Sequence, residues 1–291
     1  MENNASPENK PTSSDGWQRV IAIIPVFIIV VGLFQIAGAS LIGLDSDFYL
    51  KEKTPLQDMI LGLFMLAGSF ATVFTFKLLV DKESIISLGF YPTACYKEII
   101  AGILIGTVMI SLGFFILLQF KEIYWSNTII ELLNLIFSFL LFISVAISEE
   151  LIFRGYILSN LMRSIKPGFA LIITSLLFSI IHFPGGNFSW ISFSNIFLAG
   201  ILLGLPYIYT QSLWFPIAMH FSWNFFQGPI YGFNVSGNET YSIIQQSRVE
   251  ENIINGGSFG FEGSVLCLII QVIAIIIIWL YLKKNFDCLS Q

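Results

Sequence analysis

Apolar segments long enough to cross a bilayer run through most of the chain, and they restrict its fold more than any other feature. A transmembrane helix needs about 20 predominantly apolar residues. Only 11% of the 291 residues are charged, against about 25% in a typical soluble domain. We therefore expect an all-α, polytopic transmembrane bundle of about eight helices, near residues 18–43, 56–79, 98–120, 128–149, 168–183, 191–209, 212–230 and 264–282.

The chain is predicted to form a single membrane domain with short polar ends. Its first apolar segment exceeds the roughly 7–15 apolar residues of a signal-peptide core, so it is expected to remain as a helix. We predict a polar N-terminal tail over 1–17, one domain over 18–283 and a short tail over 284–291. A net charge of −5 argues against a nucleic-acid partner, and membrane lipid is the expected surrounding.

Lysine and arginine near the segment ends predict the orientation, because cytoplasmic loops are enriched in them. With the N-terminus inside, the inner ends carry nine of these residues and the outer ends four. We therefore expect both termini in the cytoplasm. The inner residues are Lys10, Arg19, Lys77, Lys82, Lys97, Arg163, Lys166, Lys283 and Lys284, and the outer ones are Lys51, Lys53, Lys121 and Arg248.

The three cysteines, Cys95, Cys267 and Cys288, are far apart and form no C-x-x-C pair. This spacing predicts neither a disulfide framework nor a thiolate zinc site. Cys288 opens a C-terminal sequence Cys-Leu-Ser-Gln that formally matches a lipidation signal. We interpret the match as chance, because one of its two aliphatic positions is serine.

Ionisable side chains are costly inside a bilayer, yet one predicted span carries Glu149, Glu150 and Arg154. Glu150 and Arg154 are four residues apart, so they share a helix face and can form an ion pair. Glu149 is rotated about 100° around the helix axis from Glu150. It has no cation as a partner on its own helix, which favours a role as general base for Glu149. A salt-bridge cluster that only fixes packing is the alternative, but it does not explain the second, unpaired carboxylate.

The two histidines of the chain, His182 and His220, also lie in apolar segments. Phe178 shares a helix face with His182 and is placed to shield its imidazole from lipid. Asn224 shares a face with His220 in the same way. Alone, His182 could be a polar residue hydrogen-bonded to a backbone carbonyl, and His220 with Asn224 could form interhelical hydrogen bonds. Because both histidines fall in such patterns beside a double acid, we interpret the set as one site.

Turn chemistry at Pro167 and Gly168 predicts a helical hairpin that pivots near Lys166. Glu149 lies 17 residues before that pivot and His182 lies 16 residues after it. Because both antiparallel helices rise by about 1.5 Å per residue, the two side chains should reach nearly the same depth. The sequence therefore predicts that Glu149 and His182 can meet.

The motifs E-E-x-x-F-R-G, F-x-x-x-H and H-x-x-x-N, in this order on successive helices, resemble those of the CAAX protease and bacteriocin-processing (CPBP) family. That family includes the type II CAAX prenyl endopeptidases. The resemblance covers about residues 90–283, with no departure at the motif positions. The glycine-rich segment 256–260 is similar to that of bacterial members, which implies a bacterial cell membrane.

The resemblance implies an intramembrane endopeptidase with Glu149 as the residue that activates water and His182 beside it. His220 and Asn224 would be metal ligands or oxyanion stabilisers. Two histidines and one carboxylate match a catalytic zinc set of Glu149, His182 and His220, and we favour this version over a metal-free one. The implied catalytic set is Glu149, Glu150, Arg154, His182, His220 and Asn224.

The expected substrate is a membrane-associated or lipidated peptide or protein, reached from the cytoplasmic side. Two other functions stay open at this point. Intact motifs show capacity rather than use, so a non-catalytic bacteriocin self-immunity protein or scaffold is one of them. An ion-coupled transporter is the other, because intramembrane Glu, Arg and His also form proton relays, although the sequence shows no inverted repeat.

Overall fold

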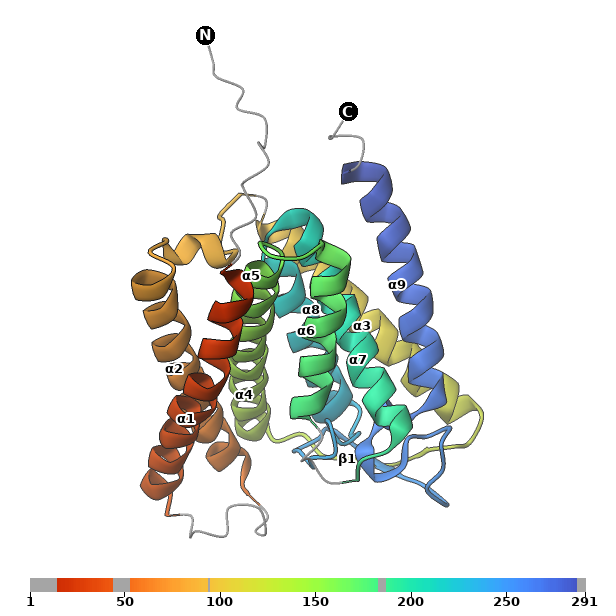
Figure 1. The fold of residues 1–291 in the computed structure, drawn as a ribbon. Helices are drawn as coiled ribbons and strands as arrows, with labels where there is room; N and C mark the ends of the chain where they lie inside the picture. Colours follow the sequence, from red (N-terminus) through yellow and green to blue (C-terminus); the bar gives the residue numbers. More distant parts are fainter. Residues whose placement is uncertain (1–14, 44–52, 94, 183–186, 287–291) are drawn as a thin grey trace.

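The computed structural model describes residues 15–43, 53–93, 95–182 and 187–286. Lys10, Lys51 and Cys288 lie outside these ranges. The described helices stand side by side in one bundle, and α1 begins at the same end of the bundle at which α9 ends (Figure 1). We call this end the terminal end, and we call the opposite end, at which α2 begins, the loop end.

The bundle confirms the expected all-α, polytopic membrane fold. Six described helices are long and apolar enough to cross a membrane. Two shorter helices, α6 (Pro167–Ile181) and α8 (Trp214–Phe225), complete the bundle. The six are α1 (Gly16–Leu41), α2 (Pro55–Thr75), α3 (Cys95–Gln119), α4 (Leu132–Glu150), α7 (Trp190–Thr210) and α9 (Val265–Phe286).

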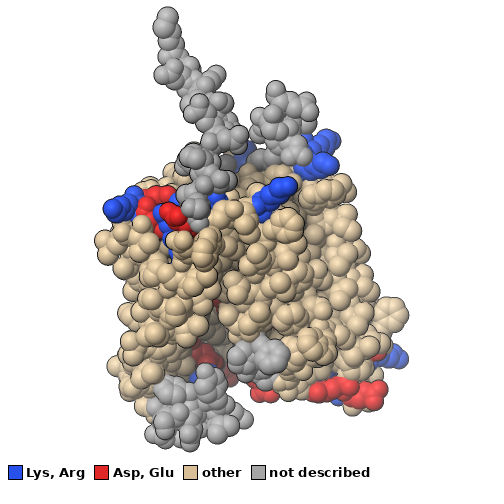
Figure 2. Space-filling view, viewed as in Figure 1, with Lys and Arg blue, Asp and Glu red and all other residues tan. Residues whose placement is uncertain are grey.

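The outer surface of the bundle is apolar, as contact with lipid requires. Large side chains such as Ile28 and Leu33 on α1 and Ile277 on α9 are more than half exposed. Figure 2 shows charged side chains gathered at the two ends of the molecule, with a wide band almost free of charge between them. By contrast, α8 is largely buried and packs against α3 and α4.

A π-helical stretch, η3 (Leu151–Leu158), follows α4 directly and leads into the short α5 (Ser159–Leu161). All eight residues of η3 are buried. Such widened turns inside helices are often found at functional sites, and this one begins just after Glu150. The next helix, α6, begins at Pro167, where proline suits the first helical position.

The loop end carries irregular structure that the apolar pattern does not predict. Strands β1 (Tyr124–Thr128) and β2 (Ile244–Ser247) pair there in an antiparallel ribbon. A Cβ atom on Gly260 would lie 1.9 Å from the Asn234 carbonyl oxygen, and its φ is +92°, so the chain needs glycine there. The remaining short helical segments are η1 (Phe76–Val80), η2 (Ile85–Leu88), η4 (Phe226–Ile230), η5 (Gly257–Phe259) and η6 (Phe261–Gly263).

A charged cluster at the terminal end ties the N-terminal helices to the helix that carries Glu149. The Lys77 Nζ atom is fully buried and lies 2.8 Å from Glu83 Oε2. Both terminal nitrogens of Arg163 donate to Glu83, at 2.6 and 2.7 Å. Tyr156, on η3, donates its hydroxyl to Asp81 at 3.1 Å. The cluster therefore connects η1, η3 and the segment after α5.

This cluster predicts an acid-sensitive component of stability. The pKa of Glu83 is lowered from 4.5 to about 2, mainly because Arg163 donates hydrogen bonds to its carboxylate. The hydrogen bond and the positive charge of Lys77 lower this pKa further. A carboxyl whose pKa is depressed in the folded state stabilises that state above its unfolded pKa, and this contribution disappears as pH falls toward the folded pKa. We expect the Tm in detergent to fall between pH 4.5 and about 2, and Glu83→Gln to flatten that fall. An unchanged pH profile in the variant would contradict this.

Candidate active site

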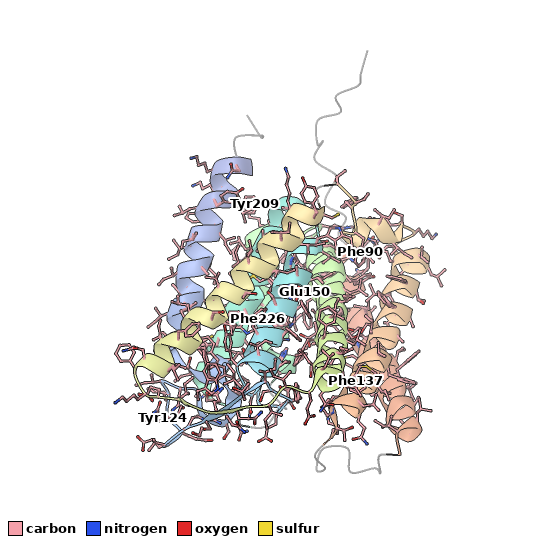
Figure 3. All side chains as sticks on the ribbon, turned by 180° about the vertical axis from the view of Figure 1, so that it is seen from behind. Phe90, Tyr124, Phe137, Glu150, Tyr209 and Phe226 are labelled. Atoms are coloured by element: carbon pink, nitrogen blue, oxygen red, sulfur yellow. The ribbon has the colours of Figure 1, made fainter. Side chains whose placement is uncertain are left out.

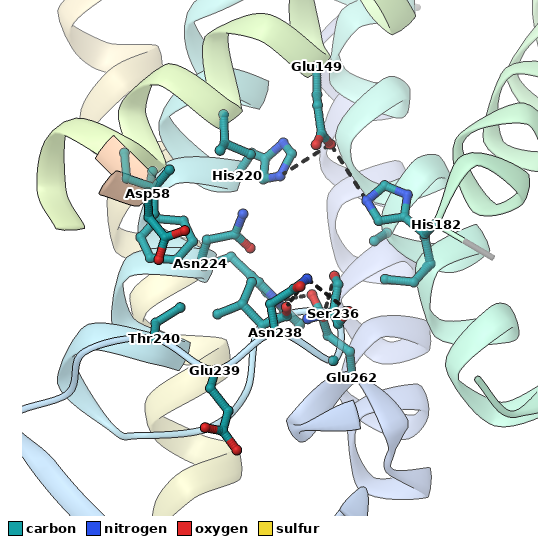
Figure 4. A pocket seen from close by; sticks show the side chains of 18 of the residues that line it. Asp58, Glu149, His182, His220, Asn224, Ser236, Asn238, Glu239, Thr240 and Glu262 are labelled. Atoms are coloured by element: carbon teal, nitrogen blue, oxygen red, sulfur yellow. Dashed lines mark hydrogen bonds and ion pairs between the residues drawn. The ribbon is translucent and has the colours of Figure 1, made fainter. Parts of the chain in front are cut away.

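The residues singled out in the sequence lie on three helices that meet in the interior of the bundle. Glu149 and Glu150 end α4, His182 directly follows the last residue of α6, and His220 and Asn224 lie on α8. Glu149, His182, His220 and Asn224 line one cavity of about 910 Å³, and Figure 4 shows their side chains directed toward it.

The Glu149 carboxylate lies between the two imidazole rings. Its Oε2 atom is 3.8 Å from His182 Nε2 and 3.9 Å from His220 Nε2 (Figure 4). Both separations exceed the range of a direct hydrogen bond. Among the described residues, Glu149 Oε2 is buried without a hydrogen-bond partner. The hairpin that places His182 beside Glu149 turns where the sequence predicts it, between α5 and α6.

The other nitrogen of each ring is held by an acceptor. His182 Nδ1 lies 2.7 Å from the Phe178 carbonyl oxygen, and His220 Nδ1 lies 2.8 Å from Glu150 Oε1. A carbonyl and a carboxylate can only accept, so each Nδ1 carries the hydrogen. In the neutral rings, each Nε2 therefore presents a lone pair toward Glu149. Three acceptor atoms thus converge on one point at the inner end of the cavity.

Glu150 and Arg154 support this site from behind and do not line the cavity. Arg154 Nη1 donates to Glu150 Oε1 at 2.7 Å, and Arg154 Nη2 donates to the Gly200 carbonyl oxygen at 3.0 Å. The same Glu150 oxygen accepts from His220. Both charged side chains are buried, with exposed fractions of 0% and 1%. Glu150 therefore fixes the His220 ring, and Arg154 balances the charge of Glu150. Figure 3 shows Glu150 deep in the middle of the bundle.

Phe178 is the aromatic centre of the site. Its ring centroid lies 4.8 Å from that of His182 and 6.2 Å from that of His220. The Arg154 guanidinium carbon lies 4.7 Å from the same ring, within cation–π range. The sequence places Phe178 beside His182 alone, whereas the fold also brings it against the other histidine and the arginine. It thereby shields the charged pair from the cavity.

Several other polar residues of this cavity lie outside the sequence motifs, and Glu262 and Gln271 are buried examples. Glu262, in η6, accepts from Trp223 Nε1 at 3.1 Å and from the Ser236 backbone N–H at 2.8 Å, so it ties α8 to the loop below it (Figure 4). Gln271, on α9, is fully buried, and neither of its amide atoms has a partner among the described residues. Two features of the sequence could have indicated them. Glu262 is an acid within a glycine-rich segment, and Gln271 is a single polar residue in an apolar segment.

Replacing Glu262 with glutamine should destabilise the protein by about 1–3 kcal/mol, the cost of an unpaired buried polar group. Its two oxygens accept from different donors, Trp223 and Ser236, and an amide keeps one acceptor and turns an N–H₂ toward the other donor. Denaturant unfolding in detergent would measure the effect. Glu239→Gln, at an exposed residue, is the matched control, and equal stability of the two variants would contradict the expectation.

The side chains of the site include the types of ligand atom that zinc prefers in proteins. Two imidazole nitrogens and one carboxylate oxygen form a common catalytic set, and the hydrogen bonds at both Nδ1 atoms are those that orient metal-binding histidines. In the described part of the chain, however, no group of three or more His, Cys, Asp or Glu residues is arranged to hold a metal ion. The expected metal set Glu149, His182 and His220 therefore stays a prediction.

Fold and site together define a multi-pass membrane protein with a carboxylate–imidazole site buried in its helical bundle. Residues 131–226 match the model of the Rce1-like family, described as type II CAAX prenyl endopeptidase Rce1-like. The matched third of the chain contains every residue from Glu149 to Asn224 that the motifs single out. The match confirms the family resemblance and supports a CAAX-type intramembrane protease at the level of the family. No curated protein and no solved structure matches this chain.

Proposed function

We propose that this protein is an intramembrane endopeptidase that hydrolyses a peptide bond of a membrane-associated peptide or protein. The observation that carries the proposal is the convergence of Glu149 Oε2 with the Nε2 atoms of His182 and His220 at the inner end of the cavity. Three acceptors around one point suit a molecule that donates hydrogen bonds, and water does so with two hydrogens. The Rce1-like family match supports the same reaction class.

In the proposed reaction, Glu149 acts as the general base. Water donates one hydrogen to Glu149 and the other to an imidazole Nε2, and Glu149 removes its proton as the water oxygen bonds to the carbonyl carbon of the peptide. The same proton then passes from Glu149 to the leaving nitrogen as the C–N bond breaks. The products are a new carboxyl group and a new amine.

The oxyanion formed in this step needs hydrogen-bond donors close by. Asn224 follows His220 by one helical turn and lines the cavity, so its amide N–H₂ can provide them. The His220 ring adds a donor when its Nε2 atom is protonated. Glu150 accepts from Nδ1 of the same ring and stabilises the charged imidazolium. If zinc is bound, Glu149, His182 and His220 would hold it, and it would supply Lewis-acid polarisation of water or carbonyl oxygen.

The proposal is tested with the purified protein in lipid vesicles and a quenched fluorogenic membrane peptide. We expect His182→Ala and His220→Ala each to lower kcat/KM by about 10²–10⁴, the usual contribution of acid–base groups. Lys121→Ala, at an exposed residue, is the control variant. Wild-type rates in both histidine variants would overturn the proposal. Zinc analysis of the same samples distinguishes the zinc-dependent reaction from the metal-free one. Zinc that is bound by the wild type and lost in both variants supports the zinc set.

A further inference from the structure

The cavity has a direction, which follows from the residues that line it. From Glu149 it extends to Lys53 and Asp58 beside the start of α2, to Asn134 at the start of α4 and to the loop segment 235–241. All of these lie at the loop end of the bundle. Toward the terminal end, the site is closed by the Glu150–Arg154 pair and by η3, whose residues are all buried.

The two ends of the bundle carry opposite charge. The described residues at the terminal end include eight Lys or Arg and four Asp or Glu. Those at the loop end include three Lys or Arg and seven Asp or Glu. Blue side chains accordingly gather at the terminal end in Figure 2, and red ones are prominent at the loop end. The excess of Lys and Arg marks the cytoplasmic side of a membrane protein, which is therefore the terminal end. The eight are Arg19, Lys77, Lys82, Lys97, Arg163, Lys166, Lys283 and Lys284.

From these two observations we infer that the cavity opens on the outer, non-cytoplasmic face of the membrane and that its substrate is a peptide with basic residues that enters from that side. The substrate part rests on the proposed function. The direction differs from the cytoplasmic access expected from the sequence, because only the folded bundle determines which of its ends the cavity reaches.

The chemistry of the entrance supports a cationic peptide. Glu239 is exposed on the loop that borders the cavity, and Glu262 lies deeper in the wall. Among the described residues that line the cavity, Lys53 is the one Lys or Arg, and it lies 3.5 Å from Asp58, which balances its charge. A cleft lined by acidic groups concentrates ligands of opposite charge. Apolar residues farther in, such as Met65 and Phe142, offer room for apolar side chains beside the basic ones.

Cysteine labelling tests the direction independently of any activity. In a background with Cys95, Cys267 and Cys288 replaced by alanine, Glu239→Cys and Lys284→Cys are treated with a membrane-impermeant maleimide in intact cells. We expect Glu239→Cys to react and Lys284→Cys to react only after permeabilisation. The reverse pattern would overturn the inference. If the cysteine-free protein folds poorly, a fusion of green fluorescent protein to the C-terminus of the otherwise native chain is used instead. Fluorescence of the fusion supports a cytoplasmic terminal end. A fusion protein that is present in the membrane but not fluorescent contradicts it.

Cleavage in oriented vesicles tests the substrate class. Two impermeant fluorogenic peptides share an apolar sequence and differ in carrying lysines or glutamates. We expect right-side-out vesicles to cleave the lysine peptide about tenfold faster than the glutamate peptide at low salt, with a smaller ratio at high salt and in Glu239→Gln. Cleavage by sealed inverted vesicles, or equal rates for both peptides, would contradict the inference. Correct labelling without cleavage even in detergent would instead contradict the proposed function and leave the direction standing.

Discussion

Glu149→Gln is expected to lower kcat/KM for a membrane peptide by about 10²–10⁴, the contribution of a general base, while the protein stays folded. The amide keeps the size of the side chain but cannot accept the proton of water. The two imidazole Nε2 atoms still face this position, because Phe178 and Glu150 hold their rings from the other side. Initial rates with the reconstituted protein, together with a thermal unfolding curve, would separate lost chemistry from lost structure.

The matched control for Glu149→Gln is Glu250→Gln, the same change at an exposed residue of the loop end. This variant should retain the wild-type rate and the wild-type unfolding temperature. If Glu149→Gln unfolds at the wild-type temperature and also retains the wild-type rate, Glu149 is not the base. A function without catalysis, as a self-immunity protein or a scaffold, would then become the better interpretation of the fold.

Arg154→Leu is expected to lower the free energy of unfolding by about 3–5 kcal/mol, the usual cost of removing one partner from a buried ion pair. The change leaves the Glu150 carboxylate fully buried and removes the donor to the Gly200 carbonyl oxygen. It also removes the cation over Phe178. Unfolding by denaturant in detergent micelles would measure the loss, with Lys97→Leu, at an exposed residue outside the pair, as the control.

The double variant Glu150→Leu/Arg154→Leu separates stability from activity. Replacing both partners of a buried pair by apolar residues is often neutral or stabilising, so we expect most of the lost stability to return. Activity should not return, because His220 Nδ1 has lost its carboxylate acceptor. A double variant with the wild-type rate would show that Glu150 does not position His220.

The sequence predicts those parts of the protein that the bilayer and short-range turn chemistry determine. Long helices such as α1 and α9 follow from apolar length alone. The hairpin around Lys166 follows from Pro167 and Gly168. Because Glu149 and His182 lie at nearly equal offsets from that turn, their meeting could be expected before the fold was known. Spacing of four residues likewise predicts the Glu150–Arg154 pair.

Other features depend on packing between distant segments, which apolar length does not encode. The widened turns of η3 need a change of hydrogen-bond register that composition does not reveal. Glu262 acquires its role because the loop before α9 folds back against Trp223, 39 residues earlier. The direction of the cavity depends on where α2 begins and where the loop of Glu239 lies, and both are set only in the assembled bundle.

The sharpest test of hydrolysis by Glu149 is mass spectrometry of the products formed from a membrane peptide in ¹⁸O-labelled water. The reconstituted wild-type protein should release two fragments whose masses add up to the peptide plus one water, with ¹⁸O in the new carboxyl group of the N-terminal fragment. The Glu149→Gln protein should release these fragments about 10²–10⁴ times more slowly. The same labelled fragments at the same rate from both proteins would contradict the assignment of Glu149 as the residue that activates water.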